Sequence, residues 1–338
     1  MRVVAPLLAL SLLAGCQANG RPEATRPFPD AGVSTQASDD SVEWTLRLVE
    51  ATIHPVLVTS IAVSDGRLGA VDDRQDAWVV ESGQWRRIDL PALSTWVTSA
   101  SADRLVFGTT DGHACVWRSE TERAGCARLP FPDPAARVRV VGDTALVSSP
   151  SGYALVDVET ASVIASVRTE LSFGSMTLTD APGLIRATND AGLTVEWSIR
   201  DGRVTRVDGV PALTAMSTVL WGARGARFIV AEGRVAVLST YTYGREVPDA
   251  EWEGQAALLD GSGDLNVVAA VSGSEEKVLL YDGDLRVRAS LPLRSSEEEP
   301  QVTALDLSED GRLLAVAYRD GTVGLYEIRR HAEKSPFP

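Results

Sequence analysis

The sequence predicts an all-β fold, a seven-bladed β-propeller at residues 42–330 that is closed by an N-terminal strand pairing with the last blade. Three observations predict it. Units of short alternating strands recur at a period of about 40 residues, which is typical of propeller blades. Tight turns, several of them Asp-Gly, join the strands within a unit. The last unit lacks a fourth strand, and a spare strand precedes the first unit.

The N-terminus has the pattern of an export signal. A positive residue precedes an apolar run at 3–13, which is shorter than the roughly 20 residues of a membrane-spanning helix. Ala14 and Gly15 follow, directly before Cys16. This segment resembles the lipobox of bacterial lipoproteins, and the resemblance implies that residues 1–15 are removed and that Cys16 is acylated. An ordinary signal peptide cut after Gly15 is the alternative.

Residues 16–41 connect the expected anchor to the propeller. They are rich in Pro, Ala, Ser, Thr and Asp and have no apolar period, which predicts a disordered tether. Because two or more acyl chains hold a protein firmly on a membrane, we expect a lipid-anchored protein of the cell envelope. By the same resemblance, Gln17 in place of an Asp favours the outer membrane over the inner membrane.

The segment at 42–49 is the spare strand. Its apolar and polar residues alternate, as those of a half-buried strand do. The last unit, at 302–328, supplies three strands, and the C-terminal tail at 331–338 contains Pro and no apolar alternation. Pairing 42–49 with the last unit would complete that blade and join the two ends of the ring.

Seven units start near residues 58, 97, 136, 176, 216, 256 and 302. In four of them the third strand ends in a bulky residue followed by an acidic one: Val80-Glu81, Val156-Asp157, Tyr281-Asp282 and Tyr326-Glu327. These dipeptides resemble the Trp-Asp ending of WD repeats, and the resemblance implies a WD-repeat-like propeller. The Gly-His dipeptide of WD repeats is absent, so a more general propeller class stays open.

Two cysteines remain besides Cys16. Cys115 and Cys126 lie on what we predict to be the two arms of one hairpin. An exported protein keeps disulfides, so we predict that these two residues pair. The sequence has no C-x-x-C motif, which favours a structural disulfide over redox chemistry.

The sequence offers no catalytic constellation. His54, His113 and His331 are dispersed, so we expect no metal site. Nucleotide-binding glycine motifs and a nucleophile elbow are missing, so we predict no catalytic residue and no cofactor. The net charge of −14 argues against nucleic acid as a partner. Carboxylates that meet over the central channel stay open, because the sequence does not show which acids converge.

Loops on a rigid scaffold are the usual place for binding. We expect Trp96, and with a weaker case Trp252, in loops that precede a first strand, where an aromatic side chain supplies contact energy. These two residues are the candidate binding face. The alternative for Trp96 is a side chain packed between adjacent blades. We assign four other tryptophans to the core: Trp44, Trp78, Trp117 and Trp197.

The expected function is therefore a non-enzymatic protein-binding or assembly platform, anchored to the envelope by N-terminal lipidation. We expect a protein partner in the envelope, and membrane contact through the lipid alone. Fold does not imply function, so two alternatives stay open. One is a propeller that binds carbohydrate or peptidoglycan, and the other is a propeller-type envelope hydrolase, a lactonase or a glycosidase.

Overall fold

In the residues that the computed structural model describes, the regular secondary structure consists of β-strands. These residues are 44–54, 56–64, 66–81, 83–101, 103–169, 173–179, 183–189, 194–199, 204–206, 217–222, 227–232, 237–242, 249–253, 256–272, 277–292 and 302–330. The predicted signal peptide, Cys16, the tether and the tail at 331–338 lie outside them. The described part contains no helix that could cross a membrane.

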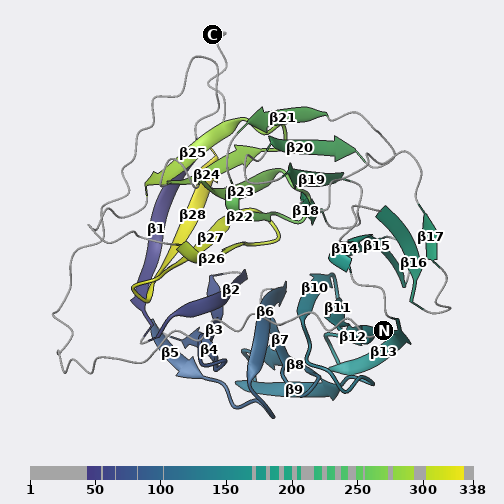
Figure 1. Cartoon of the computed structure of the whole chain (residues 1–338). Helices are drawn as coiled ribbons and strands as arrows, with labels where there is room; N and C mark the ends of the chain where they lie inside the picture. The colour runs from purple at the N-terminus through teal and green to yellow at the C-terminus, as the bar shows by residue number, and fades with distance from the viewer. Residues whose placement is uncertain are drawn as a thin grey trace, which may run out of the picture. The chain divides into compact units, whose positions relative to one another are not determined.

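The strands form seven four-stranded antiparallel sheets within the described residues (Figure 1). We number the sheets from 1 to 7 by the position of their innermost strand in the chain. Sheet 1 contains β2 (Val58–Ser64), β3 (Arg67–Asp72), β4 (Ala77–Glu81) and β5 (Gln84–Arg87). Sheet 2 contains β6 (Ser94–Ser101), β7 (Arg104–Thr109), β8 (His113–Arg118) and β9 (Arg123–Arg128). Sheet 3 contains β10 (Arg137–Val141), β11 (Thr144–Ser149), β12 (Gly152–Asp157) and β13 (Ser162–Arg168).

The other four sheets follow the same order from the innermost strand outward. Sheet 4 contains β14 (Phe173–Leu178), β15 (Leu184–Asn189), β16 (Thr194–Ser198) and β17 (Val204–Arg206). Sheet 5 contains β18 (Ser217–Trp221), β19 (Arg227–Glu232), β20 (Val237–Thr242) and β21 (Ala250–Glu253). Sheet 6 contains β22 (Ala256–Gly261), β23 (Val267–Ser272), β24 (Lys277–Asp282) and β25 (Val287–Pro292). Sheet 7 contains β26 (Val302–Leu307), β27 (Leu313–Tyr318), β28 (Thr322–Arg330) and β1 (Trp44–Ile53).

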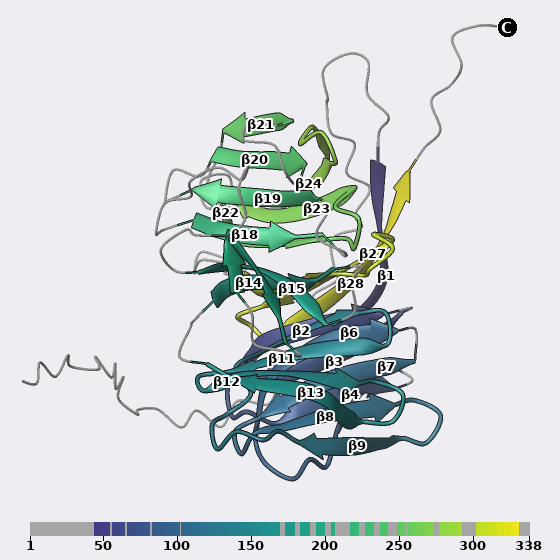
Figure 2. The ribbon, with the colours of Figure 1, turned by 90° about the vertical axis from the view of Figure 1, so that its right-hand side faces the viewer.

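The innermost strands close a ring. β2 contacts β6, and the contacts continue in order through β10, β14, β18, β22 and β26, which contacts β2 again. The predicted unit starts lie within three residues of the first residues of these strands. The predicted all-β propeller class is confirmed, and Figure 2 shows the stacked sheets from the side.

The N-terminal strand completes the last sheet, as predicted. β1 is the outermost strand of sheet 7 and runs antiparallel to β28, with Trp44 opposite Arg330 and Ile53 opposite Thr322. Trp44 and Leu46 are buried in the apolar cluster between sheets 6 and 7. The two ends of the propeller are therefore held together by backbone pairing and by core packing.

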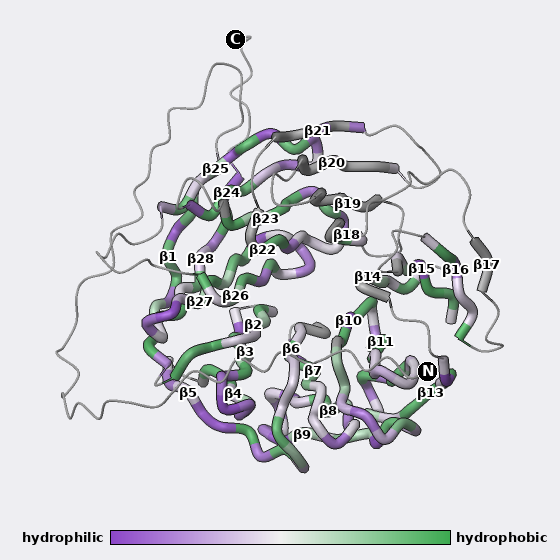
Figure 3. The backbone as a smooth tube through the Cα atoms, viewed as in Figure 1, coloured by the Kyte–Doolittle hydropathy of each residue, from purple (hydrophilic) through white to green (hydrophobic). Residues whose placement is uncertain are grey.

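The apolar core is divided among the spaces between neighbouring sheets. Val106 and Val147, for example, belong to one buried cluster between sheets 2 and 3, and hydrophobic residues follow the strands in Figure 3. Among the tryptophans assigned to the core, Trp44, Trp117 and Trp197 are buried. Trp78 is half-buried, and its indole N–H donates to the Asp72 carboxylate at 2.9 Å.

The predicted disulfide is present. Cys115 on β8 and Cys126 on β9 are directly opposite in the strand register and are bonded to each other. The bond ties the outermost strand of sheet 2 to the strand beside it.

The ring has two faces, which we name by their connections. At the loop face the innermost strands begin, so this face carries the connections between sheets and the turns between second and third strands. At the hairpin face the innermost strands end, so this face carries the turns between first and second strands and those between third and fourth strands. β1 begins at the hairpin face, where Trp44 pairs with the last residue of β28.

Candidate functional site

Trp96 projects from the loop face, but it does not lie in a loop as predicted. It is the third residue of β6, where its side chain is 38% exposed and is one of the few large apolar side chains at the surface of the described residues. The next residue, Val97, is buried. Packing between blades, the alternative for this residue, therefore does not bury it completely.

A β-bulge in β6 explains why Trp96 is exposed although it lies in a strand. Ser94 pairs with Thr109 and Trp96 pairs with Gly108, so Thr95 is an extra residue in the register. A bulge of this kind bends the strand and turns a side chain away from its expected direction. The sequence did not reveal it, because a run of Ser, Thr and Trp before Val97 shows no alternation.

Leu93 lies beside Trp96 and is 47% exposed. Its backbone is held on both sides, because the N–H of Ser94 donates to the Gln75 carbonyl at 2.7 Å and the N–H of Thr110 donates to the Leu93 carbonyl at 2.8 Å. Leu93 thus stands on a connection that is hydrogen-bonded to sheets 1 and 2, and Trp96 stands in the strand that follows it.

Two carboxylates lie in other connections of the loop face, Asp111 between β7 and β8 and Asp133 between β9 and β10. Asp111 accepts hydrogen bonds from the Thr109 hydroxyl at 2.7 Å and from Nδ1 of His113 at 2.8 Å. Burial acts to raise the pKa of Asp111, but these hydrogen bonds outweigh it and the pKa is lowered. Asp133 accepts a hydrogen bond from the Ser151 hydroxyl.

Trp252, the second predicted binding residue, lies elsewhere. It is in β21, the outermost strand of sheet 5, opposite Leu238 in the register. It is therefore also in a strand and not in a loop. Sheets 2 and 5, which carry Trp96 and Trp252, are not neighbours in the ring.

The histidines have structural contacts where they are described. His54 is buried, its Nδ1–H donates to the Val56 carbonyl at 2.9 Å, and its ring packs edge-on against Trp78 and Trp85. His331 lies outside the described residues. The described part of the chain holds no group of three or more His, Cys, Asp or Glu that could bind a metal ion.

Acidic side chains do meet at the central channel, a point that the sequence left open. Asp260 on β22 accepts from the N–H of Leu307 at 2.6 Å, and Asp306 on β26 accepts from the N–H of Val63 at 2.7 Å. Each carboxyl group thus bridges to the innermost strand of the next sheet. With Arg139 they line a cavity of about 50 Å³.

This cavity is a poor substrate site. Ligand pockets typically measure about 300–1,000 Å³, and both carboxyl groups already serve the contacts between sheets. Arg139 reaches across to donate to the Trp221 carbonyl at 2.7 Å. The channel acids therefore do not support the hydrolase alternative.

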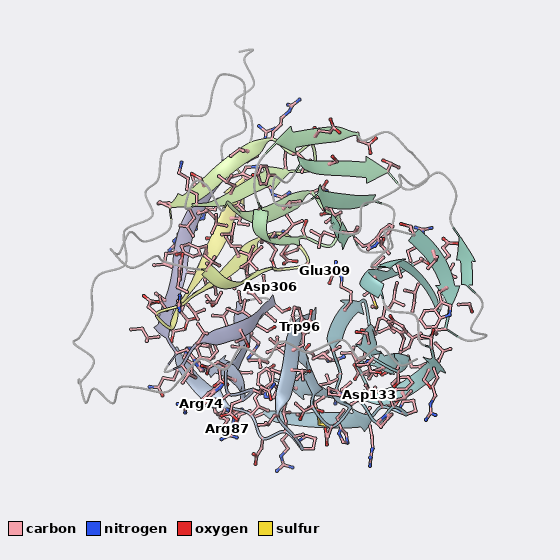
Figure 4. All side chains as sticks on the ribbon, in the orientation of Figure 1. Arg74, Arg87, Trp96, Asp133, Asp306 and Glu309 are labelled. Carbon is pink, nitrogen blue, oxygen red and sulfur yellow. A yellow bond between two sulfur atoms is a disulfide. The ribbon has the colours of Figure 1, made fainter. Side chains whose placement is uncertain are left out.

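A wider groove of about 710 Å³ lies on the hairpin face between sheets 7 and 1. Side chains of both charge signs line it, among them Arg47, Arg312, Glu309 and Glu327, together with the exposed Val49. It adjoins β1, whose first residue lies on the same face. In Figure 4, Glu309 and Asp306 are near the centre of the ring.

The closed ring of antiparallel sheets defines the class of protein as a β-propeller. No protein-family model and no curated protein matches the sequence. Among solved structures, the chain is similar to one in the "Crystal Structure of Mitotic Checkpoint Complex", at 12% identity and a TM-score of 0.61, covering 92% of this chain and 99% of that one. At this identity the similarity establishes the fold alone.

Proposed function

We propose that this protein is a non-enzymatic protein-binding platform of the bacterial envelope, anchored by a lipid on Cys16. The observation that carries the proposal is the exposed pair Leu93 and Trp96 on the loop face. Exposed aromatic and aliphatic side chains on rigid connections are the usual anchors of protein interfaces. A WD-repeat-like propeller suits such a role.

The course of β1 supports the anchored arrangement. Trp44, its first residue, lies on the hairpin face, opposite Arg330. Trp44 therefore lies on the face opposite to the start of β6, the strand that carries Trp96. A lipid at the far end of the chain that precedes Trp44 would leave the loop face free for a partner, and Gln17 favours the outer membrane as its location.

The disulfide supports export. Disulfides persist in oxidising compartments such as the periplasm and are rare in the cytosol. The pairing of Cys115 with Cys126 therefore agrees with an export signal at the N-terminus.

Labelling tests the anchor. Cells fed a clickable fatty acid should yield a labelled mature protein, and Cys16→Ser should abolish the label and release the protein from membranes. An unlabelled wild-type protein would contradict the lipid anchor and favour the ordinary signal peptide.

Matched variants test the binding face. Leu93→Ser with Trp96→Ala should abolish the complexes that chemical crosslinking captures in cells, because the contact area is removed. The control pair is Ile164→Ser with Val287→Ser, which removes exposed apolar side chains from the outermost strands β13 and β25. Complexes that survive in both variants would exclude the loop face, and signal on a glycan array without any protein adduct would favour the carbohydrate binder.

A further inference from the structure

His54 lies in the connection between β1 and β2, which joins sheet 7 to sheet 1 on the loop face. The residue is 2% exposed, and its backbone N–H donates to the Gly321 carbonyl at 2.8 Å. Gly321, at φ +82°, comes so close to the His54 carbonyl that no Cβ would fit between them. The connection is therefore held tightly against the turn between β27 and β28.

The imidazole ring of His54 has a hydrogen-bond partner for one of its two nitrogens. Nδ1–H donates to the Val56 carbonyl at 2.9 Å, which leaves Nε2 of the neutral ring without a proton. Nε2 is buried and has no hydrogen-bond partner within the described residues. The rings of Trp78 and Trp85 stand edge-on to the imidazole, with centroids 4.8 and 4.9 Å away. A proton on Nε2 would therefore create a buried donor without an acceptor, which is costly.

Burial and nearby charges act against each other on this ring. Burial lowers the pKa of His54, and it outweighs the Val56 carbonyl, Asp72 and Asp73, which all act to raise it. The other charged groups on the surrounding elements are Glu50 on β1, Arg74 and Asp76 in the turn between β3 and β4, Arg87 on β5, and Arg319 and Asp320 in the turn between β27 and β28. Burial decides the balance, so the closed connection holds a neutral ring.

The Asp72 carboxylate is already engaged by other groups. One of its oxygens accepts from the backbone N–H groups of Arg74 and Asp76, each at 2.9 Å, and the other accepts from the Trp78 indole at 2.9 Å. Arg87 pairs with Asp76 at 2.8 Å. Asp72 therefore attracts a protonated His54 ring through space and is not hydrogen-bonded to it.

The turn between β3 and β4 connects this region to the proposed binding residues. The N–H of Asp73 donates to the Leu57 carbonyl at 2.8 Å, just after His54 in the chain. On the other side of the turn, the Gln75 carbonyl accepts from the N–H of Ser94 at 2.7 Å, next to Leu93. The segment after His54 and the connection that carries Leu93 are therefore bonded to the same turn.

We infer that His54 is an acid-sensitive latch: protonation of its ring opens the connection between sheets 7 and 1 and loosens the turn and the connection that hold Leu93. The inference goes beyond the proposed function, because the opening needs no partner. Its consequence for a partner rests on that function, since a protein bound at Leu93 should be released on acidification.

Proton linkage sets the direction of the latch. The open connection exposes the ring to water, where it takes up a proton with the ordinary pKa of about 6.5, whereas the closed connection takes it up only at lower pH. The closed state is therefore fully favoured above about pH 6.5 and loses stability as the pH falls below that value. Because one proton is bound, opening should rise by up to about tenfold for each pH unit in this window.

Hydrogen–deuterium exchange of the full mature chain, from about pH 7.5 to about pH 5.5, measures the opening. The rates are corrected for the intrinsic dependence of amide exchange on pH. Segments 51–58 and 91–97 should lose protection as the pH falls, and the strands of sheet 3 should keep theirs. Unchanged protection of either segment, or an equal loss in sheet 3, would overturn the inference.

Three variants assign the response to His54. His54→Asn keeps an N–H for the Val56 carbonyl, and His54→Phe keeps a ring against the two tryptophans, but neither side chain titrates in this range. Both variants should lose the pH response, which is compared within each protein and so does not depend on its baseline stability. His113→Asn replaces the other histidine of the described residues, which pairs with Asp111, and should keep the response. A response that persists in either His54 variant, or is lost in His113→Asn, would refute His54 as the titrating group.

The latch and the platform fail separately. Exchange needs no partner, so an absent pH response overturns the latch and leaves the platform unaffected. Crosslinked complexes that do not depend on Leu93 and Trp96 overturn the platform and leave the latch unaffected.

Discussion

Two half-buried carboxyl groups at the channel link sheet 7 to the sheets on either side of it. The Asp260 carboxyl group accepts a hydrogen bond from the N–H of Leu307, and the Asp306 carboxyl group accepts one from the N–H of Val63. These side chains therefore link sheets 6, 7 and 1 at the channel. Burial raises the pKa of Asp306 well above its ordinary value, and the nearby Asp260 raises it further. Burial also raises the pKa of Asp260, and the positive charge of Arg139 offsets part of this rise.

This raised pKa predicts how stability depends on pH. Folded Asp306 keeps its proton at pH values where the unfolded chain has lost it, so its contribution is fully present below the unfolded pKa of about 4 and is lost as the pH rises through the folded pKa. Asp306→Asn retains an acceptor for Val63 without this titration. Urea unfolding between acidic and neutral pH should show the variant gaining stability relative to the wild type as pH rises, and a difference that is constant with pH would refute the assignment.

The sequence contains a pattern that points to this pair of acids. Leu259-Asp260-Gly261-Ser262 and Leu305-Asp306-Leu307-Ser308 place an acid at the same position of two consecutive repeats, inside an otherwise apolar strand. What the sequence did not reveal is that the two side chains share one cavity, since this depends on how the ring closes.

At the scale of single elements, the register of a hairpin determines which two cysteines can form a disulfide. Cys115 and Cys126 were predicted to pair because they lie on facing arms, and they are opposite in the register of β8 and β9. Trp96 shows the limit of the same reasoning, since the bulge at Thr95 depends on how β6 meets β7 and not on local alternation.

Replacing both Cys115 and Cys126 with Ser should lower the free energy of unfolding by about 3 kcal/mol in the chain-entropy model. The two residues are separated by 11 positions, so the closed loop is short. Chemical denaturation of the wild type under reducing conditions provides the control and should give the same loss. A stability unchanged in both experiments would show that the bond contributes nothing.

Two substitutions in β1 test whether this strand is part of the core that closes the ring. Leu46→Asp places a charge in the cluster between sheets 6 and 7 and should cost at least about 3 kcal/mol. Val49→Asp, on the same strand, changes a residue that is 54% exposed and should shift stability by about 0.5 kcal/mol or less. Thermal unfolding measures both, and equal effects would mean that β1 is not part of the core.

At the scale of the whole molecule, the ring follows from the repeats. The period of about 40 residues and the strand at 42–49 were enough to predict the architecture, because a blade can bury its two sides only against neighbours. The proposed binding surface was predicted only in part. Trp96 was singled out by residue type, whereas the exposure of Leu93 depends on the backbone bonds that hold the connection before β6.

Deleting residues 42–49 should remove cooperative unfolding of the ring. Sheet 7 would lose the first six residues of its outermost strand β1, and with them the pairs from Trp44 to Leu48 that join β1 to β28. Differential scanning calorimetry should then show a broad or multiple transition. A single transition at the wild-type temperature would contradict closure by β1.

The central claim is that the loop face, opposite to the face on which β1 begins, holds the partner. A photocrosslinking amino acid placed at position 93 or at position 49, in otherwise identical anchored proteins, tests it most directly in cells. Leu93 and Val49 are both exposed apolar residues, one on each side of the ring. The account predicts a protein adduct of discrete mass from position 93 and none from position 49. Adducts from position 49 alone, or of the same mass and yield from both, would contradict it.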